Sequence, residues 1–196
     1  QIRIEVVGNA SHELRTPLTS IKGYLDTLKQ DTRTGRTGDA EKFLDIISRN
    51  VDRLIFLVND LLDLSTIESG AELVKSVVNV REVTESALKQ LEAKRASRGV
   101  EIRAHYGVDN MQADPRRVEQ VLTNLVHNAI KYIPEGRHID IFWENSVDGA
   151  VLRVKDNGPG IPLEHQSRLF ERFYRIDAGR SREQGGTGLG LSIVKH

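Results

Sequence analysis

His12 stands beside an acid, Glu13, and one helical turn before a hydroxyl, Thr16, in the stretch NASHELRTPLTSIKGYLDTL (residues 9–28). The apolar residues of this stretch recur at intervals of four and three, a spacing typical of the seam of an amphipathic helix. With about 100° per residue, His12 lies roughly opposite that seam and is predicted to be exposed. A neutral, exposed imidazole is a nucleophile, and Glu13 could accept or share the proton on its other nitrogen. Without further motifs, such a histidine would be an ordinary surface residue.

Two asparagines and a lysine share one flank of a second predicted helix. Asn124, Asn128 and Lys131 lie roughly 100° from the apolar stripe of that helix. Carboxamide oxygens are hard, neutral ligands that suit Mg²⁺, and a lysine one turn on could meet a phosphate. Taken alone, asparagines at such positions are more often solvated surface residues.

Two glycine-containing segments could approach a ligand. In DNGPGIP (residues 156–162), Asp156 could accept a hydrogen bond from a base amino group while Gly158 and Gly160 admit the ligand, although a tight turn explains the segment equally well. GGTGLGLSIVKH (185–196) runs from glycines into an apolar helix, which presents amide donors to phosphate. The arginine-rich segment between them (169–184) is expected to form a mobile flap over a polyanion.

The phosphoacceptor candidate must be positioned by the first half of the chain. Helices are predicted around residues 3–30 and 40–68, separated by the polar loop DTRTGRTGD. The second helix is apolar over so wide an arc that a hairpin alone would leave much of it wet, so we predict a four-helix bundle closed by two copies. A monomer whose hairpin packs on the second half is the alternative. Pro17 predicts a kink beside His12.

Helices and strands alternate in the second half. Strands are predicted at ELVKSVVNV (72–80), VEIRAHY (100–106), HIDIFWE (138–144) and AVLRVKD (150–156). One helix is expected to end at Gly99, and another to run from Asp114-Pro115 to about Tyr132. This order predicts an α+β layer with the sheet on one side and the helices on the other.

Composition excludes several classes of protein. Lys and Arg together number 28 in 196 residues, as do Asp and Glu, and the resulting zero net charge gives no nucleic-acid footprint. The absence of cysteine excludes disulfides and cysteine-rich zinc sites. No apolar run approaches the length of a membrane span, so attachment to a membrane would come only through a missing N-terminal part.

Five motifs, in order, resemble those of the bacterial sensor histidine kinases. SHELRTPLTSI is similar to their phosphoacceptor box, NLVHNAIKY to the asparagine box, DNGPGIP to the first glycine box, LFERFYRID to the phenylalanine box and GGTGLGLSIVKH to the second glycine box. The stretch SHELRTPLTSIKGYLDTL looks most like the subgroup that includes the phosphate-regulon sensors.

This resemblance implies two domains and a fold of the class α followed by α/β. Residues 1–70 would be the dimerisation and histidine phosphotransfer domain, an antiparallel helical hairpin that forms a dimeric four-helix bundle. Residues 71–196 would be an α/β sandwich that binds ATP, of the type shared with DNA gyrase, the Hsp90 chaperones and MutL, truncated at its C-terminus. The chain would be the cytoplasmic portion of a sensor anchored in the bacterial inner membrane.

The resemblance also implies a protein histidine kinase. His12 would be phosphorylated from ATP and would pass the phosphoryl group to an aspartate of a response regulator, which is expected to dock near Ser20, Gly23 and Tyr24. The form H-E-x-x-T is associated with regulator phosphatase activity, and the Thr16 hydroxyl could orient a water in line with the phosphoaspartate. Alternatively, Thr16 merely helps the helix accommodate Pro17.

For the nucleotide pocket, the resemblance implies that Asn128 holds Mg²⁺ and that Asn124 supports the phosphate side. Lys131 would face phosphate, Tyr132 would lie near the adenine, and Asp156 would bind its exocyclic amine. The remaining residues expected to shape the ATP pocket are Gly158, Gly160, Gly186, Thr187, Gly188, Leu189 and Gly190.

Two other classes of function compete with the kinase. A non-kinase ATPase of the same nucleotide fold would explain the second half of the chain but not SHELRTP on a dimerising hairpin. An interaction module with a decayed ATP site would be expected to lack Asn128 or Asp156, and both residues are present.

Overall fold

The computed structural model describes residues 2–35, 38–70, 72–176 and 186–195, with side chains from residue 8 onward. Contacts within the chain divide it into two compact units. The helical unit contains residues 1–69 and 169–192, and the sheet unit contains residues 70–168 and 193–196. No described helix combines the length and the apolar character that crossing a membrane requires.

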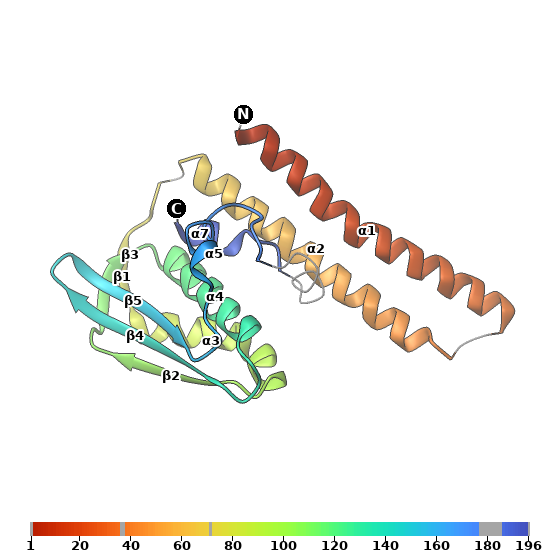
Figure 1. The fold of residues 1–196 in the computed structure, drawn as a ribbon. Helices are drawn as coiled ribbons and strands as arrows, with labels where there is room; N and C mark the ends of the chain where they lie inside the picture. The colour runs from red at the N-terminus through yellow and green to blue at the C-terminus, as the bar shows by residue number, and fades with distance from the viewer. Residues whose placement is uncertain (1, 36–37, 71, 177–185, 196) are drawn as a thin grey trace. The chain divides into compact units, whose positions relative to one another are not determined.

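Two long helices, α1 (Ile2–Thr34) and α2 (Ala40–Glu68), form an antiparallel hairpin, as Figure 1 shows. Both predicted helices are therefore confirmed. The α1 helix continues without a break through Pro17, whose side chain is fully buried. In the turn before Pro17, the Thr16 hydroxyl donates a hydrogen bond to the backbone carbonyl of His12 at 3.3 Å.

The hairpin leaves many apolar side chains in water. Leu62, for example, is 61% exposed. The other large apolar residues exposed on the two helices are Leu18, Leu25, Leu44, Val51, Ile55, Phe56 and Val58. Such an extended apolar surface exceeds what a soluble monomer normally presents.

The sheet unit contains two small sheets. The strand β2 (Glu101–Tyr106) pairs in parallel with β4 (His138–Ser146), which pairs in antiparallel with β5 (Gly149–Asp156). The strand β1 (Ser76–Asn79) pairs in antiparallel with β3 (Asn110–Ala113). The first strand is shorter than predicted at both ends, because it begins at Ser76 rather than Glu72 and because Val80, its last expected residue, already begins a helix.

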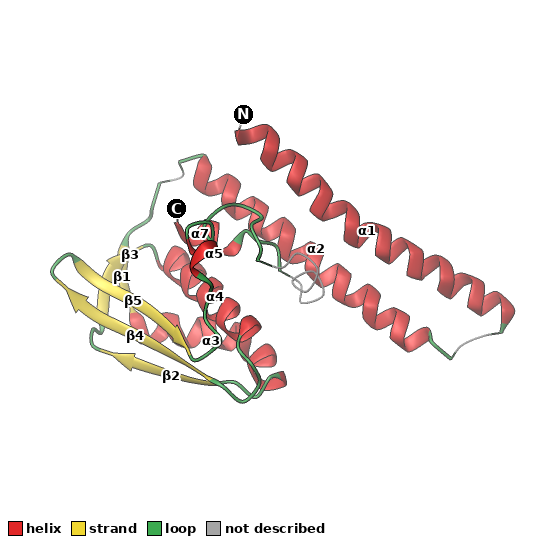
Figure 2. Cartoon of the chain, viewed as in Figure 1, coloured by secondary structure: helices red, strands yellow, loops and turns green. Residues whose placement is uncertain are grey.

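Two helices, α3 (Val80–Ser97) and α4 (Pro115–Tyr132), cover one face of the larger sheet, as Figure 2 shows. Each begins at a side-chain cap, since the carboxamide of Asn79 and the carboxylate of Asp114 accept hydrogen bonds from the first backbone amides. The predicted arrangement of helices on one side and sheet on the other is thus confirmed.

Alternate residues of β4 build the core between these helices and the sheet. Ile139, Ile141 and Trp143 are at most 1% exposed. The Trp143 indole donates to the Thr84 hydroxyl on α3 at 2.9 Å, so the largest core side chain has its polar atom satisfied. Two short helices complete the described chain, α5 (Leu163–Gln166) and α7 (Gly190–Lys195).

Candidate functional site

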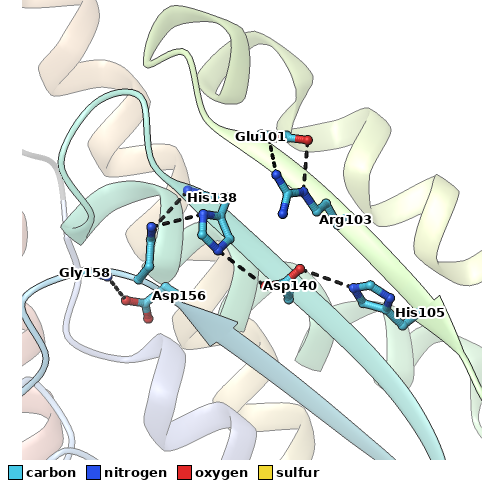
Figure 3. A network of polar contacts seen from close by, with 8 residues as sticks. Glu101, Arg103, His105, His138, Asp140, Asp156 and Gly158 are labelled. Atoms are coloured by element: carbon cyan, nitrogen blue, oxygen red, sulfur yellow. Dashed lines mark hydrogen bonds and ion pairs between the residues drawn. The ribbon is translucent and has the colours of Figure 1, made fainter.

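Two histidines are fixed on the open face of the larger sheet, where Asp140 lies between them (Figure 3). His105 Nε2 lies 3.2 Å from one carboxylate oxygen, and His138 Nε2 lies 3.6 Å from the other. The His138 Nδ1 atom also contacts the Asn157 carboxamide at 3.0 Å, and the His105 ring stacks on Phe142. Both rings are therefore held by neighbours within the sheet unit.

His12 differs from every other histidine in the described part of the chain. His165 lies 3.4 Å from Glu164, and His127 lies 2.6 Å from Lys94. The His12 ring is exposed, as predicted, and no polar contact to another described residue engages it. Its two nitrogens are thus available to a reaction partner.

Glu13 turns toward α2 rather than toward solvent. Its Oε2 atom accepts a hydrogen bond from Arg53 on α2 at 2.7 Å and another from Arg175 at 2.9 Å, both within the helical unit. Arg53 is a residue that the sequence-based prediction missed. Its signal was available, because Arg53 lies on the same helical stripe as the buried Leu57 and Leu64.

The two asparagines on α4 are half-buried and lie beside its apolar face. That face contributes Leu122, Val126 and Ile130 to the core, each at most 1% exposed. The carboxamides of Asn124 and Asn128 form no hydrogen bond with another described residue. Half-buried carboxamides without a protein partner suit a polar ligand, which fits the predicted role in holding magnesium and phosphate.

Lys131 and Tyr132 form a pair at the end of α4. The Lys131 ammonium is buried, donates to the Tyr132 hydroxyl at 3.0 Å and lies 4.6 Å from the centre of the tyrosine ring. The Tyr132 side chain is 52% exposed. Lys131 therefore supplies a buried positive charge, and Tyr132 next to it supplies an exposed aromatic side chain.

His127 is held neutral next to this pair. A lysine ammonium can only donate, so Lys94 donates to His127 Nε2 and the imidazole proton is assigned to Nδ1. Burial, together with the nearby charges of Lys94 and Lys131, lowers the pKa of His127 to about 4. This contact between α3 and α4 was not predicted from the sequence.

The end of β5 meets the end of α4. The Asp156 Oδ1 atom accepts the Gly158 amide hydrogen bond at 2.8 Å, the local turn that the sequence allowed. A side chain at Gly158 would overlap this oxygen and the Ile133 side chain, at 2.7 and 3.0 Å. Gly160 has a φ of +75°, which favours glycine. The structure thus brings the segment from Asp156 to Gly158 against the residues that follow the asparagine box.

Arg98, which the sequence-based prediction did not assign to the site, secures the same corner. Its guanidinium donates to the carbonyls of Lys131 at 2.9 Å and of Ile133 at 2.8 Å. These carbonyls flank Tyr132 at the C-terminal end of α4, where the backbone carbonyls of a helix have no amide partner within the helix. Arg98 therefore fixes the backbone that carries the Lys131–Tyr132 pair.

The second glycine box belongs to the helical unit up to Ser192, whereas Asn128 and Asp156 belong to the sheet unit. The structure therefore groups the predicted residues in two sets. Gly188 packs with a φ of +76° against the Phe173 backbone, which would lie 2.8 Å from an added Cβ. Gly186 and Leu189 precede α7, the helix expected after the glycines, which begins at Gly190. Gly185 and most of the predicted flap, residues 177–184, lie outside the described residues.

Thr187 contacts α2. Its hydroxyl donates to Asp60 Oδ2 and accepts from the Leu189 amide at 3.2 Å. Burial is the main reason that the pKa of Asp60 is raised to about 6; the bond from Thr187 opposes this rise, and the charge of Asp63 adds to it. Thr187, which was predicted to shape the ATP pocket, is therefore bonded to Asp60 within the helical unit.

Two families match this chain. Residues 2–70 match the His Kinase A (phospho-acceptor) domain, and residues 113–196 match the histidine kinase-, DNA gyrase B- and HSP90-like ATPase. The sensor histidine kinase WalK of Bacillus subtilis (strain 168) is 37% identical over 199 residues, which cover 100% of this chain and 32% of WalK. The signal transduction histidine-protein kinase BarA of Escherichia coli (strain K12) is 36% identical over 204 residues, covering 100% of this chain and 22% of BarA. The chain thus spans a third or less of these relatives.

The similar solved structures are also histidine kinases. The histidine kinase AdeS of Acinetobacter baumannii superposes with a TM-score of 0.73 at 32% identity, covering 93% of this chain and 83% of that one. The histidine kinase ThkA, in complex with the response regulator protein TrrA, superposes with a TM-score of 0.71 at 27% identity, covering 87% of this chain and 50% of that one.

Proposed function

Because this chain belongs to the histidine kinases, we propose that it phosphorylates His12 from ATP and passes the phosphoryl group to an aspartate of a response regulator in two-component signalling. The observation that carries the proposal is the His12 ring, which is exposed and has no polar partner among the described residues. The structure of ThkA bound to a response regulator supports the choice of partner.

The chemistry of the first step needs few groups from the hairpin. One imidazole nitrogen of His12 forms the nitrogen–phosphorus bond while the bond from the terminal phosphorus to ADP breaks. The proton on the other ring nitrogen passes to the Glu13 carboxylate or is shared with it. Glu13, held at the level of His12, would thereby raise the nucleophilicity of the imidazole. Phosphoryl transfer otherwise depends mainly on positioning and on neutralising charge.

The sheet unit would supply the nucleotide site. Magnesium, when bound, neutralises phosphate charge, and Asn128 would hold it through a carboxamide that has no partner among the described residues. Asn124 and Lys131 would support the phosphates. Tyr132 and Asp156 would receive the adenine, since the tyrosine face is accessible and only one Asp156 oxygen is engaged by Gly158.

We also propose that the hairpin dimerises into a four-helix bundle. The exposed apolar residues of α1 and α2 support this arrangement, because a second copy would remove them from water. The regulator would dock below His12 near Ser20, Gly23 and Tyr24. Tyr24 is half-buried, with its ring 5.4 Å from Phe43 on α2, so it would present an edge rather than a free side chain.

Several finer assignments remain proposals of the same kind. The domain boundary is placed between residues 70 and 71, with the phosphotransfer domain before it and the ATP-binding domain after it. The stretch SHELRTPLTSIKGYLDTL supports a subgroup with the phosphate-regulon sensors. Anchoring of a longer protein in the inner membrane, with this part in the cytoplasm, follows from the likeness to sensor kinases.

Radiolabelled ATP tests the function directly. Incubation of the full protein with ATP labelled in its terminal phosphate should give an acid-labile, base-stable label, which is the behaviour of phosphohistidine. The His12→Ala variant should bind ATP but take up no label, whereas the control His105→Ala should be labelled like the wild type. Label that survives in His12→Ala would place the acceptor elsewhere. Release of phosphate without label would identify an ATPase. The absence of both label and phosphate release would identify a binding module.

A further inference from the structure

Arg53 occupies a position on α2 where apolar residues are the norm. The described buried residues of that helix are Arg53, Leu57 and Leu64, at intervals of four and seven. Arg53 is only 7% exposed. Arginine is rarely buried to this extent unless a partner neutralises it, because an unpaired buried charge is costly. Its partner therefore indicates what the residue does.

That partner is Glu13 on α1. The Arg53 Nη2 atom lies 2.7 Å from Glu13 Oε2, and the two side chains are 8% and 16% exposed. Arg175 donates to the same oxygen at 2.9 Å. Ion pairs on an open surface contribute little, whereas a shielded, charge-assisted hydrogen bond fixes both groups more firmly.

The position of this pair along α1 matters because Glu13 follows His12 directly. Neighbouring residues of a helix point about 100° apart, so His12 faces solvent while Glu13 faces α2. Arg53 thus holds the carboxylate in the seam between the helices, at the level of the exposed imidazole. Without Arg53, the Glu13 carboxylate loses this charge-assisted hydrogen bond from α2.

We propose that Arg53 is a positioning residue for phosphoryl transfer at His12. It acts through Glu13, whose carboxylate it fixes in direction at the level of the imidazole. This inference rests on the proposed function, in which Glu13 accepts or shares the imidazole proton. Arg53 belongs to the helical unit, whereas Asn128 and Asp156 belong to the sheet unit, so we expect its effect on the rate of transfer and not on ATP binding.

The test replaces the charge while keeping the packing. Methionine at position 53 fills the buried stripe with an unbranched side chain of similar length. Arg53→Met should lower the kcat of autophosphorylation by about 10- to 100-fold, the usual scale for a misplaced catalytic group, and leave the KM for ATP unchanged. Arg49, exposed one turn earlier on the same helix, provides the matched control, and Arg49→Met should match the wild type. Circular dichroism and light scattering verify the helix content and the oligomeric state.

A double-mutant cycle separates positioning from a general structural effect. If Arg53 acts through Glu13, then Arg53→Met should cause no further loss in a Glu13→Gln background. Arg53→Lys retains one charge without the planar fork and should give an intermediate kcat, which also provides a result if the methionine variant misfolds. An unchanged kcat, a raised KM for ATP or losses that multiply in the double variant would each overturn the proposal. Label that survives in His12→Ala would overturn the proposed function instead.

Discussion

Replacing Arg98 by methionine should loosen the corner that joins α4 to the nucleotide residues. The substitution keeps the aliphatic stem and removes the two bonds to the carbonyls of Lys131 and Ile133. Hydrogen bonds to charged groups contribute about 1.5 to 3 kcal/mol each, and freeing the long side chain returns some entropy. We therefore expect the sheet unit to lose about 2 to 4 kcal/mol of unfolding free energy. This corresponds to a fall in Tm of roughly 10 to 20 °C for a unit of this size.

Arg95 provides the matched control three residues earlier on the same helix. It also forms two hydrogen bonds, to Glu92 at 2.9 and 2.6 Å, but these join surface side chains that are 35% and 55% exposed. Surface pairs of this kind contribute little to stability, so Arg95→Met should unfold like the wild type. The contrast between the two variants isolates the partner that each arginine binds.

Trp143 allows the measurement to be made on the intact chain. It is the only tryptophan, and it is 1% exposed in the core of the sheet unit, so its fluorescence follows the unfolding of that unit. Thermal and urea transitions should shift for Arg98→Met, and the Kd for ATP measured by calorimetry should rise because Tyr132 lies between the two released carbonyls. Superimposable transitions for the two arginine variants would refute the reasoning.

Three further outcomes are expected. Asn128→Ala should abolish magnesium-dependent ATP binding while light scattering shows an intact dimer; unchanged calorimetric affinity would remove Asn128 from the site. Thr16→Ala should keep autophosphorylation near the wild-type rate and slow the decay of added phosphorylated regulator, and equal decay would favour a purely structural hydroxyl. Burial raises the pKa of Asp60 to about 6, so the folded state binds its proton more tightly than the unfolded state and loses that advantage as pH rises from about 4 to 6. Asp60→Asn should therefore stabilise the helical unit by up to about 3 kcal/mol near pH 7.5 and little near pH 4, measured by circular dichroism, whereas an equal effect at both pH values would contradict the shift.

Local signals made most of the helices predictable. Asp114 followed by Pro115 caps a helix start in the structure as in the sequence, and Gly99 follows α3 with a φ of +59°. The strand β3 was missed because NMQA, although it alternates between polar and apolar residues, is only four residues long and contains no β-branched or aromatic residue. Its strand conformation depends on pairing with β1, which lies more than 30 residues earlier. Such non-local pairing leaves no trace in a short window.

In the candidate site, too, local features could be predicted and non-local contacts could not. The motif residues could be identified one by one, whereas the residues that contact them from other helices could not. Arg53 was visible as a charge on an apolar stripe, yet its partner Glu13 lies 40 positions away and depends on the register between two helices. Lys94 and His127 are 33 positions apart and meet only because α3 packs on α4. Sequence patterns indicate which face of a helix is buried, but not which side chains meet across the contact.

The apolar surface of the hairpin would make its stability depend on protein concentration if the proposed dimer forms. Each helix leaves large side chains in water in a single copy, Leu62 by 61%, so folding of the hairpin would be linked to association with a second copy. Dilution should therefore lower the unfolding temperature of the helical unit, as it does for any protein whose core is completed by a second subunit. The core of the sheet unit around Trp143 is already buried within one chain, so its transition should not move on dilution. The concentration of the protein in the cell would then control the fraction of molecules in which the hairpin that carries His12 is folded and dimeric.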